Sequence, residues 1–196
     1  MSDEKSVRTL IPLWLAVAIT VFLAMPFGLW LGKYNFALWV CFIVWAEYFA
    51  LGAKPAALKL ILPSYSIAAI LTAVILLLVP LFSFLPSINT PGDLSSALVL
   101  AGGVGFLVFA MKWSTTIQDG ALPYFNGMTM TLAVFFSGSY PKLAATSLAP
   151  LEAGVWAVLM GMFGALLGVF NVWLTFPRES SATAANRPKA VAQSRA

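Results

Sequence analysis

Long runs of hydrophobic residues, separated by short polar segments, dominate the chain. The run over 67–79, IAAILTAVILLLV, lacks the alternation of apolar and polar positions that marks the strands of a membrane β-barrel. Several runs reach about 18 residues or more, the length at which a helix can cross the hydrocarbon core. The pattern therefore predicts an all-α fold: a polytopic helical membrane bundle of about six spans, forming a single transmembrane domain over residues 1–176.

The second and fifth spans are expected to be short and to carry polar residues. Pro, Gly, Asn, Asp and Ser over 85–96 predict a loop that divides the chain into halves. The tail over 177–196 is small, polar and basic, so we expect it to be disordered and cytoplasmic. The expected spans are 8–31, 36–53, 60–84, 96–111, 122–137 and 150–176.

Basic residues predict the orientation, because short cytoplasmic loops are enriched in Lys and Arg. With the N-terminus inside, nine basic residues lie on the inner side and two on the outer side. The inner set is Lys5, Arg8, Lys54, Lys59, Lys112, Arg178, Arg187, Lys189 and Arg195, and the outer set is Lys33 and Lys142. We therefore expect both termini to be cytoplasmic. Scattered basic residues of this kind do not indicate nucleic-acid binding, despite the net charge of +4.

The second and fifth spans share a spacing of aromatic, glycine and proline residues, at an offset of 86 or 87 residues. The aligned pairs are Tyr48–Phe49 with Phe135–Phe136, Gly52 with Gly138, Pro55 with Pro141, and Pro63 with Pro150. Each half would contain three spans, so the spacing predicts a 3+3 inverted repeat. A chance alignment is the alternative, because Gly and Pro are common in membrane loops.

Polar residues inside the two short spans are the candidate pathway residues. Glu47 is the one acidic residue well inside an expected span, where a charge is costly unless it faces protein or water. It is either a protonatable or hydrogen-bonding group in a solute pathway, or a residue solvated at a helix end. On the fifth span, a small polar stripe at helical spacing either lines the pathway or packs against another helix. The expected pathway residues are Glu47, Tyr48, Asn126, Thr129 and Ser137.

The sixth span carries a stripe of small residues at alternating steps of three and four. Small side chains allow helix backbones to approach closely, so we expect this face to pack against another helix, in the same chain or in a second copy. The expected packing residues are Gly154, Ala157, Gly161, Gly164, Gly168 and Asn171.

The composition argues against an enzyme. The chain has no histidine and a single cysteine, Cys41, which removes the commonest general base, the commonest metal ligand and any intrachain disulfide. No paired acidic site or activated serine is recognisable within the spans. We therefore expect no catalytic residues, no metal and no cofactor.

The strings WAEYFALG over 45–52 and FNGMTMTLAVFFSG over 125–138, together with the Gly-rich last span, resemble a family of small bacterial inner-membrane proteins. This family is catalogued as domain of unknown function 1097. The resemblance extends over most of residues 10–174. It implies a location in the bacterial inner membrane and names no substrate.

These observations favour a channel or facilitator for a small, largely neutral solute. An ion-coupled transporter is the second hypothesis, since such proteins usually hold several buried carboxylates and here only Glu47 is available. The third is a structural or accessory subunit of a membrane complex. The expected partners are the lipid bilayer, a small-molecule solute and a second copy of the chain, bound through small-residue helix faces.

Overall fold

The computed structural model describes residues 10–176, and within this range all regular structure is helical. The tail expected to be disordered lies outside the described residues. The α-helices are α1 (Leu13–Trp30), α2 (Leu38–Ala50), α3 (Pro55–Leu76), α4 (Asp93–Ala110), α5 (Thr115–Asp119), α6 (Ala121–Phe136) and α7 (Ala149–Thr175). Four 3₁₀ turns accompany them at Gly32–Tyr34, Val79–Phe82, Met111–Trp113 and Thr146–Leu148.

Two features differ from the pattern expected of the sequence. Helix α3 begins at Pro55 rather than near residue 60, because proline is well suited to the first helical position, where no backbone N–H partner is needed. Lys59 therefore lies on the helix and not in a loop. Helix α5 was not expected, and it begins where the Ser114 hydroxyl accepts a hydrogen bond from the Ile117 N–H at 3.4 Å.

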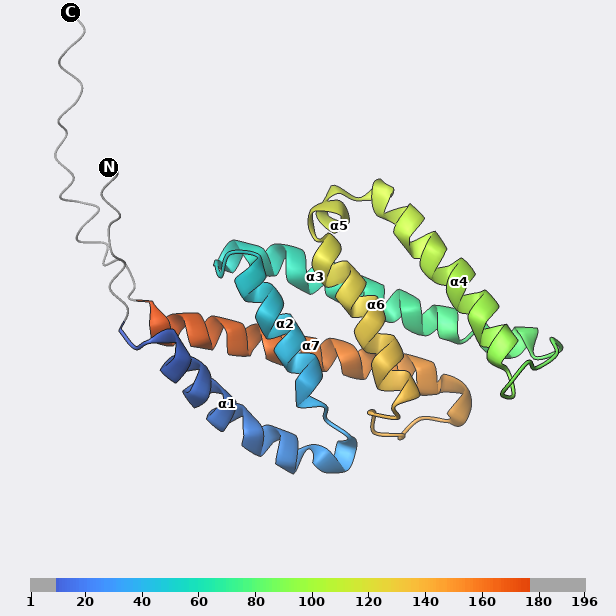
Figure 1. The fold of residues 1–196 in the computed structure, drawn as a ribbon, viewed down its shortest axis with the longest axis horizontal. Coiled ribbons are helices and arrows are strands. Elements are labelled where there is room, and N and C mark those ends of the chain that lie inside the picture. Colours follow the sequence, from blue (N-terminus) through green and yellow to red (C-terminus); the bar gives the residue numbers. More distant parts are fainter. Residues whose placement is uncertain (1–9, 177–196) are drawn as a thin grey trace, which may run out of the picture.

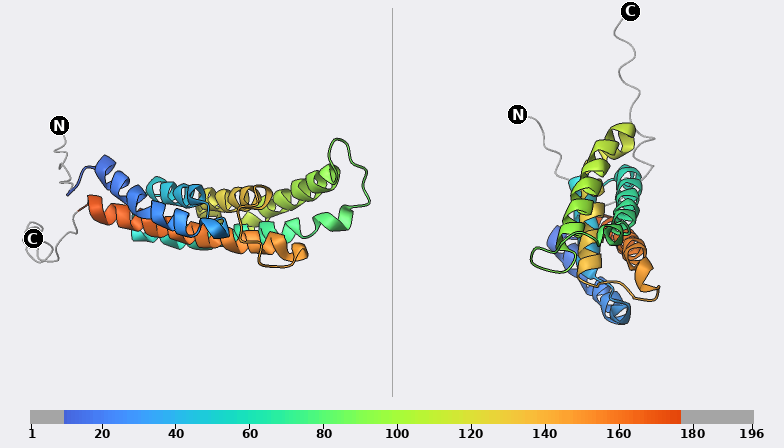
Figure 2. Two further views of the ribbon diagram at one scale, coloured as in Figure 1. Left: turned by 90° about the horizontal axis from the view of Figure 1, so that it is seen from below. Right: turned by 90° about the vertical axis from the view of Figure 1, so that its right-hand side faces the viewer.

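The two long helices α3 and α7 contact each other and form the centre of the molecule (Figure 1). Helices α2 and α6 lie on one face of this pair, as the edge-on view in Figure 2 shows. Helix α2 packs mainly on α7, and α6 packs mainly on α3. Helices α1 and α4 lie toward opposite ends of the elongated molecule, against α7 and α3 respectively.

Glycines set how closely these helices approach. A Cβ at Gly164 of α7 would collide with the carbonyl oxygen of Cys41 on α2. A Cβ at Gly127 of α6 would likewise collide with the carbonyl oxygen of Tyr65 on α3. Both short helices therefore rest directly on the backbone of a long helix, which no larger residue would permit.

Polar contacts join α1 to α7 at one end of the molecule. The Asn171 amide donates to the Thr20 hydroxyl at 3.1 Å, and the Thr20 hydroxyl donates to the Ala16 carbonyl at 2.8 Å. Nearby, the Leu10 N–H donates to the Thr175 carbonyl at 3.0 Å. The start and the end of the described chain therefore lie together, at the same end of the molecule (Figure 1).

Four helical segments are long and apolar enough to cross a membrane: Leu13–Trp30, Pro55–Phe82, Asp93–Trp113 and Thr146–Thr175. Large apolar side chains face outward on them, including Phe22 at 75% exposure and Leu29 at 74%. In water such a surface would be unfavourable, whereas in lipid it is the expected one. Helices α2 and α6 are apolar but shorter, about 20 and 24 Å at 1.5 Å per residue. The long helices indicate a membrane-embedded protein.

Candidate functional site

Glu47 lies on the buried face of α2. Helical spacing puts it on the same side as Val40, Val44 and Tyr48, which pack against the core. Its side chain is only 2% exposed. The periodicity that buries the apolar residues of α2 therefore also carries a carboxyl group into the interior.

Asn126 of α6 is the hydrogen-bond partner of Glu47. Its side-chain amide donates to Glu47 Oε1 at 2.5 Å. The second carboxyl oxygen, Oε2, is buried and has no hydrogen-bond partner among the described residues. The pair joins the two short helices, and it leaves one strong acceptor free to take a further donor or a proton.

Tyr65 of α3 completes the surroundings of the pair. Its backbone carbonyl lies against Gly127, which follows Asn126 on α6. Its hydroxyl donates to the Ala157 carbonyl of α7 at 3.4 Å, and its ring fills the space beside Gly161. We call Glu47, Tyr65 and Asn126 the central cluster. Residues of α2, α3 and α6 form it, and α7 lies against Tyr65.

The central cluster contains no cation. The lysines of the described chain lie in loops or at helix ends, at Lys33, Lys54, Lys59, Lys112 and Lys142. A carboxylate charge in a membrane interior costs about 2.5 kcal/mol or more, and an unsatisfied buried polar atom about 1–3 kcal/mol. Glu47 would be relieved of this cost by a proton, or by a donor group on a bound solute.

The structure brings only two of the five expected pathway residues together. Tyr48 is buried, but its ring packs against Gly168 of α7. Thr129 is exposed, and its hydroxyl donates to the Phe125 carbonyl of its own helix at 2.9 Å. Ser137 is also exposed at the end of α6, where its hydroxyl lies 2.8 Å from that of Ser139. The polar stripe does not form one lining, because α2 contacts α6 over only a short stretch.

The small-residue stripe of α7 faces three other helices. All six residues expected in packing are buried. Gly154 lies against Ala73 of α3, Gly161 against Tyr65, and Gly168 against Tyr48. The stripe therefore positions the helices around the central cluster, within a single chain.

Sequence reasoning missed Tyr65 and two buried hydroxyls. Thr72 of α3 and Thr131 of α6 are fully buried, and neither hydroxyl has a hydrogen-bond partner among the described residues. Thr72 stands alone in an apolar run, and Thr131 lies outside the stripe of Asn126, Thr129 and Ser137, so the spacing singles out neither. A signal was available for Tyr65, which is the only tyrosine in the third apolar run.

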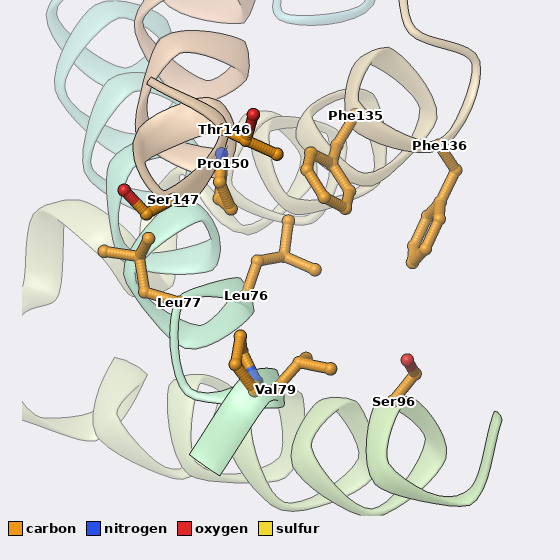
Figure 3. A pocket seen from close by; sticks show the side chains of 10 residues that line it. Leu76, Leu77, Val79, Ser96, Phe135, Phe136, Thr146, Ser147 and Pro150 are labelled. Carbon is orange, nitrogen blue, oxygen red and sulfur yellow. The ribbon is translucent and has the colours of Figure 1, made fainter. Parts of the chain in front are cut away.

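A cavity of about 170 Å³ lies away from the central cluster, where the ends of α3 and α6 meet the starts of α4 and α7 (Figure 3). Its walls are mostly apolar, with the rings of Phe135 and Phe136 on one side. Three hydroxyl-bearing residues, Ser96, Thr146 and Ser147, also border it. Neither Glu47 nor Asn126 is among its lining residues.

Fold and site together indicate a helical, membrane-embedded protein in which a buried carboxyl group pairs with a half-buried amide. Comparisons with protein-family models, curated proteins and solved structures find no match. The function is therefore argued from the central cluster itself.

Proposed function

We propose that this chain is a six-span membrane protein of the bacterial inner membrane that facilitates the passage of a small neutral solute. The observation that carries the proposal is the hydrogen bond between the buried Glu47 and the half-buried Asn126, which joins two short helices from opposite halves of the chain. Short polar segments at corresponding positions of two inverted halves border the solute site in many transporters. A carboxyl oxygen and an amide at such a site suit a solute that offers and accepts hydrogen bonds.

Matching helix ends support an inverted repeat. At the end of α2, the Ala53 N–H donates to the Tyr48 carbonyl at 2.8 Å and the Gly52 N–H donates to the Phe49 carbonyl at 3.0 Å. This is a Schellman turn, with glycine at the position of positive φ, here 90°. The equivalent bonds at the end of α6 run from Ser139 to Val134 and from Gly138 to Phe135, with φ 68° at Gly138. A proline follows at the same distance in both, Pro55 and Pro141.

The contacts between helices also correspond between the two halves of the chain. Exchanging α1, α2 and α3 with α4, α6 and α7 turns the α2–α7 contact into the α6–α3 contact. It also turns the α1–α7 contact into the α4–α3 contact, and it leaves the central α3–α7 contact unchanged. Each outer helix is followed by a 3₁₀ turn with lysine at its centre, Lys33 after α1 and Lys112 after α4. Three spans per half would invert one half relative to the other.

The structure corresponds to a closed state of the proposed pathway. With Glu47 only 2% exposed, a solute can reach it only if helices move apart. The Gly164 and Gly127 contacts hold α2 on α7 and α6 on α3. Opening would therefore have to move α2 and α6 apart at their short contact, because the more extensive α3–α7 contact joins the two long helices.

Reconstitution into liposomes tests the proposal. Stopped-flow light scattering would record the permeation of urea, glycerol and erythritol, with empty liposomes as the baseline. We expect at least one of these solutes to pass faster through protein-containing vesicles, and Asn126→Ala to change its rate. Thr129→Ala is the matched control, because Thr129 lies one turn away on α6, is exposed and bonds only to its own helix among the described residues. Rates equal to those of empty liposomes, or equal effects of the two variants, would contradict the proposal.

A second candidate, a subunit of a larger membrane assembly, is favoured by the outer face of α4. Gly102 and Gly105 lie in this apolar helix, and no atom of the described residues lies within 4 Å of a Cβ built at either position. Glycine weakens a helix by about 1 kcal/mol relative to alanine, so a close neighbour outside the chain would explain both. Co-purification of a second copy or of another membrane protein in mild detergent, lost in Gly102→Leu, would support this role.

A further inference from the structure

We infer that Glu47 carries a proton in the closed state and gives it up when the helices part, so that opening of the pathway is linked to deprotonation of this carboxyl group. The inference rests on the proposed function. It adds a regulating ion, the proton, to a pathway for a neutral solute. The experiments below separate the two ideas, because they follow the proton and the helices as well as the solute.

The first step of the argument is the hydrogen bonding of the carboxyl group. Only Oε1 receives a hydrogen bond, from Asn126. Oε2 is buried without a partner among the described residues. An ionised carboxylate is stabilised by two or three donors or by a cation, and this one has a single donor. The neutral acid therefore suits the closed site better than the carboxylate does.

The second step concerns the groups that could replace the proton. On α2 the other titratable side chains are Cys41 and Tyr48, on α3 Tyr65 and the exposed Lys59, and on α6 Tyr124, whose hydroxyl donates to the Leu107 carbonyl of α4 at 3.2 Å. The cysteine and the tyrosines are neutral when protonated, and Lys59 is exposed near the start of α3, so none offers a positive charge at the site. Between residues 13 and 30, α1 has no titratable side chain, and on α7 Glu152 lies in the first turn, held by N–H groups of the preceding loop.

A metal ion does not fit the site as well as a proton. The described residues hold no group of three or more His, Cys, Asp or Glu side chains that could bind a metal. Glu47 and Asn126 offer too few oxygen atoms to replace the hydration shell of a sodium ion. A proton needs only the free Oε2.

The third step fixes the sign of the pH dependence. If the closed state binds the proton more tightly than the open state, lowering the pH favours the closed state and raising it favours the open state. Opening and solute flux should therefore increase with pH. Glu47→Gln keeps a neutral, hydrogen-bonding side chain and should hold the protein near its low-pH behaviour at every pH.

Infrared spectroscopy tests the proton directly. We expect the reconstituted protein near neutral pH to show a carboxylic-acid C=O band that Glu47→Gln removes. Glu152→Gln is the matched control, because Glu152 lies in the first turn of α7, away from the central cluster, where it accepts hydrogen bonds from the Leu143 and Ala144 N–H groups at 2.7 and 3.1 Å. A band that survives in Glu47→Gln, or that disappears in Glu152→Gln, would overturn the inference.

Labelling of Cys41 tests the link to opening without any solute. Cys41 is the only cysteine of the chain, is fully buried, and lies on the same helix as Glu47. The rate of reaction with N-ethylmaleimide would be measured for the wild type and for Glu47→Gln over a pH series. The ratio of the two rates cancels the ordinary effect of pH on a thiol. We expect the wild-type rate divided by the Glu47→Gln rate to rise at least about threefold from about pH 6 to about pH 8.

A wild-type to Glu47→Gln rate ratio that stays constant with pH would overturn the link between opening and deprotonation. A ratio that changes when choline replaces sodium in the buffer would also overturn it. If urea, glycerol and erythritol all fail to permeate while the infrared band and the labelling ratio behave as expected, the solute proposal fails and the proton site stands. If one solute permeates at a pH-independent rate equal in wild type and Glu47→Gln, the pathway stands and the inference fails.

Discussion

At the scale of single residues, Glu47 and Asn126 depend on each other. Each is a polar side chain in an apolar helix. Among the described residues, the hydrogen bond between them is the only one that either side chain makes. Removing one partner leaves the other polar side chain without this hydrogen bond inside the bundle. Removing both leaves no polar group to satisfy, so the two substitutions should not be additive.

We expect Asn126→Ala to lower the stability by about 1–3 kcal/mol, because Glu47 then has no hydrogen-bond partner. The double variant Glu47→Ala, Asn126→Ala should be no less stable than Asn126→Ala alone. Thermal unfolding in detergent, followed by tryptophan fluorescence, would measure both. Thr129→Ala serves as the control and should change stability by less than about 0.5 kcal/mol. Additive losses in the double variant would show that the two side chains do not interact.

The sequence predicted this pair only in part. A carboxyl group and an amide inside apolar runs stand out by their cost in lipid, so Glu47 and Asn126 could be chosen without a structure. Tyr65 stands out only as the one tyrosine of its apolar run, and its role depends on which helix lies beside it. Thr129 and Ser137 share the helix face of Asn126, but α2 covers only part of that face.

At the scale of helices, glycine decides which contacts are possible. Gly164 and Gly127 each lie where a Cβ would strike the carbonyl oxygen of another helix. Backbone atoms cannot move aside as a flexible side chain can. The glycines of α4 at positions 102 and 105 have open space around them within residues 10–176. The same substitution should therefore have opposite effects at the two kinds of position.

We expect Gly164→Ala to destabilise the protein by about 2 kcal/mol or more, because α2 must move away from α7 to admit the methyl group. Gly102→Ala should be neutral or stabilising by up to about 1 kcal/mol, since alanine favours the helix. Melting temperatures in detergent would compare the two variants with the wild type. A Gly164→Ala protein as stable as Gly102→Ala would mean that α2 and α7 are not in close contact. A loss of stability in Gly102→Ala would instead indicate a helix from another chain at this face.

Helix ends were predictable where the residue chemistry is specific. Gly52 and Gly138 mark the ends of the short helices, because each takes a positive φ that other residues adopt only at a cost. The start of α3 was not predictable in the same way. Pro55 with Lys59 four residues later is equally typical of a loop and of the start of a helix. Helix α5 has only five residues, too few for an amphipathic pattern to be recognised.

At the scale of the whole molecule, the two halves carry their basic residues at corresponding places. Lys33 and Lys112 occupy the centres of the 3₁₀ turns that follow α1 and α4. Lys33 lies over the ring of Tyr34, and Lys112 over the ring of Phe109. In a parallel repeat these two lysines would face the same side of the membrane. In the inverted repeat that we propose, they face opposite sides, Lys33 outside and Lys112 inside.

Cysteine labelling in intact cells distinguishes these arrangements. In a Cys41→Ala background, which has no other cysteine, we expect Lys33→Cys to react with a membrane-impermeant maleimide from outside. Lys112→Cys should react only after the membrane is permeabilised. The loop over 85–96 is expected outside, and α4 then crosses the membrane to bring position 112 to the inner side. Lys142→Cys and Lys54→Cys extend the test to the loops after α6 and α2, and should behave like positions 33 and 112 respectively. Labelling of positions 33 and 112 from the same side would rule out the inversion, and with it the argument that Glu47 and Asn126 lie between two oppositely oriented halves.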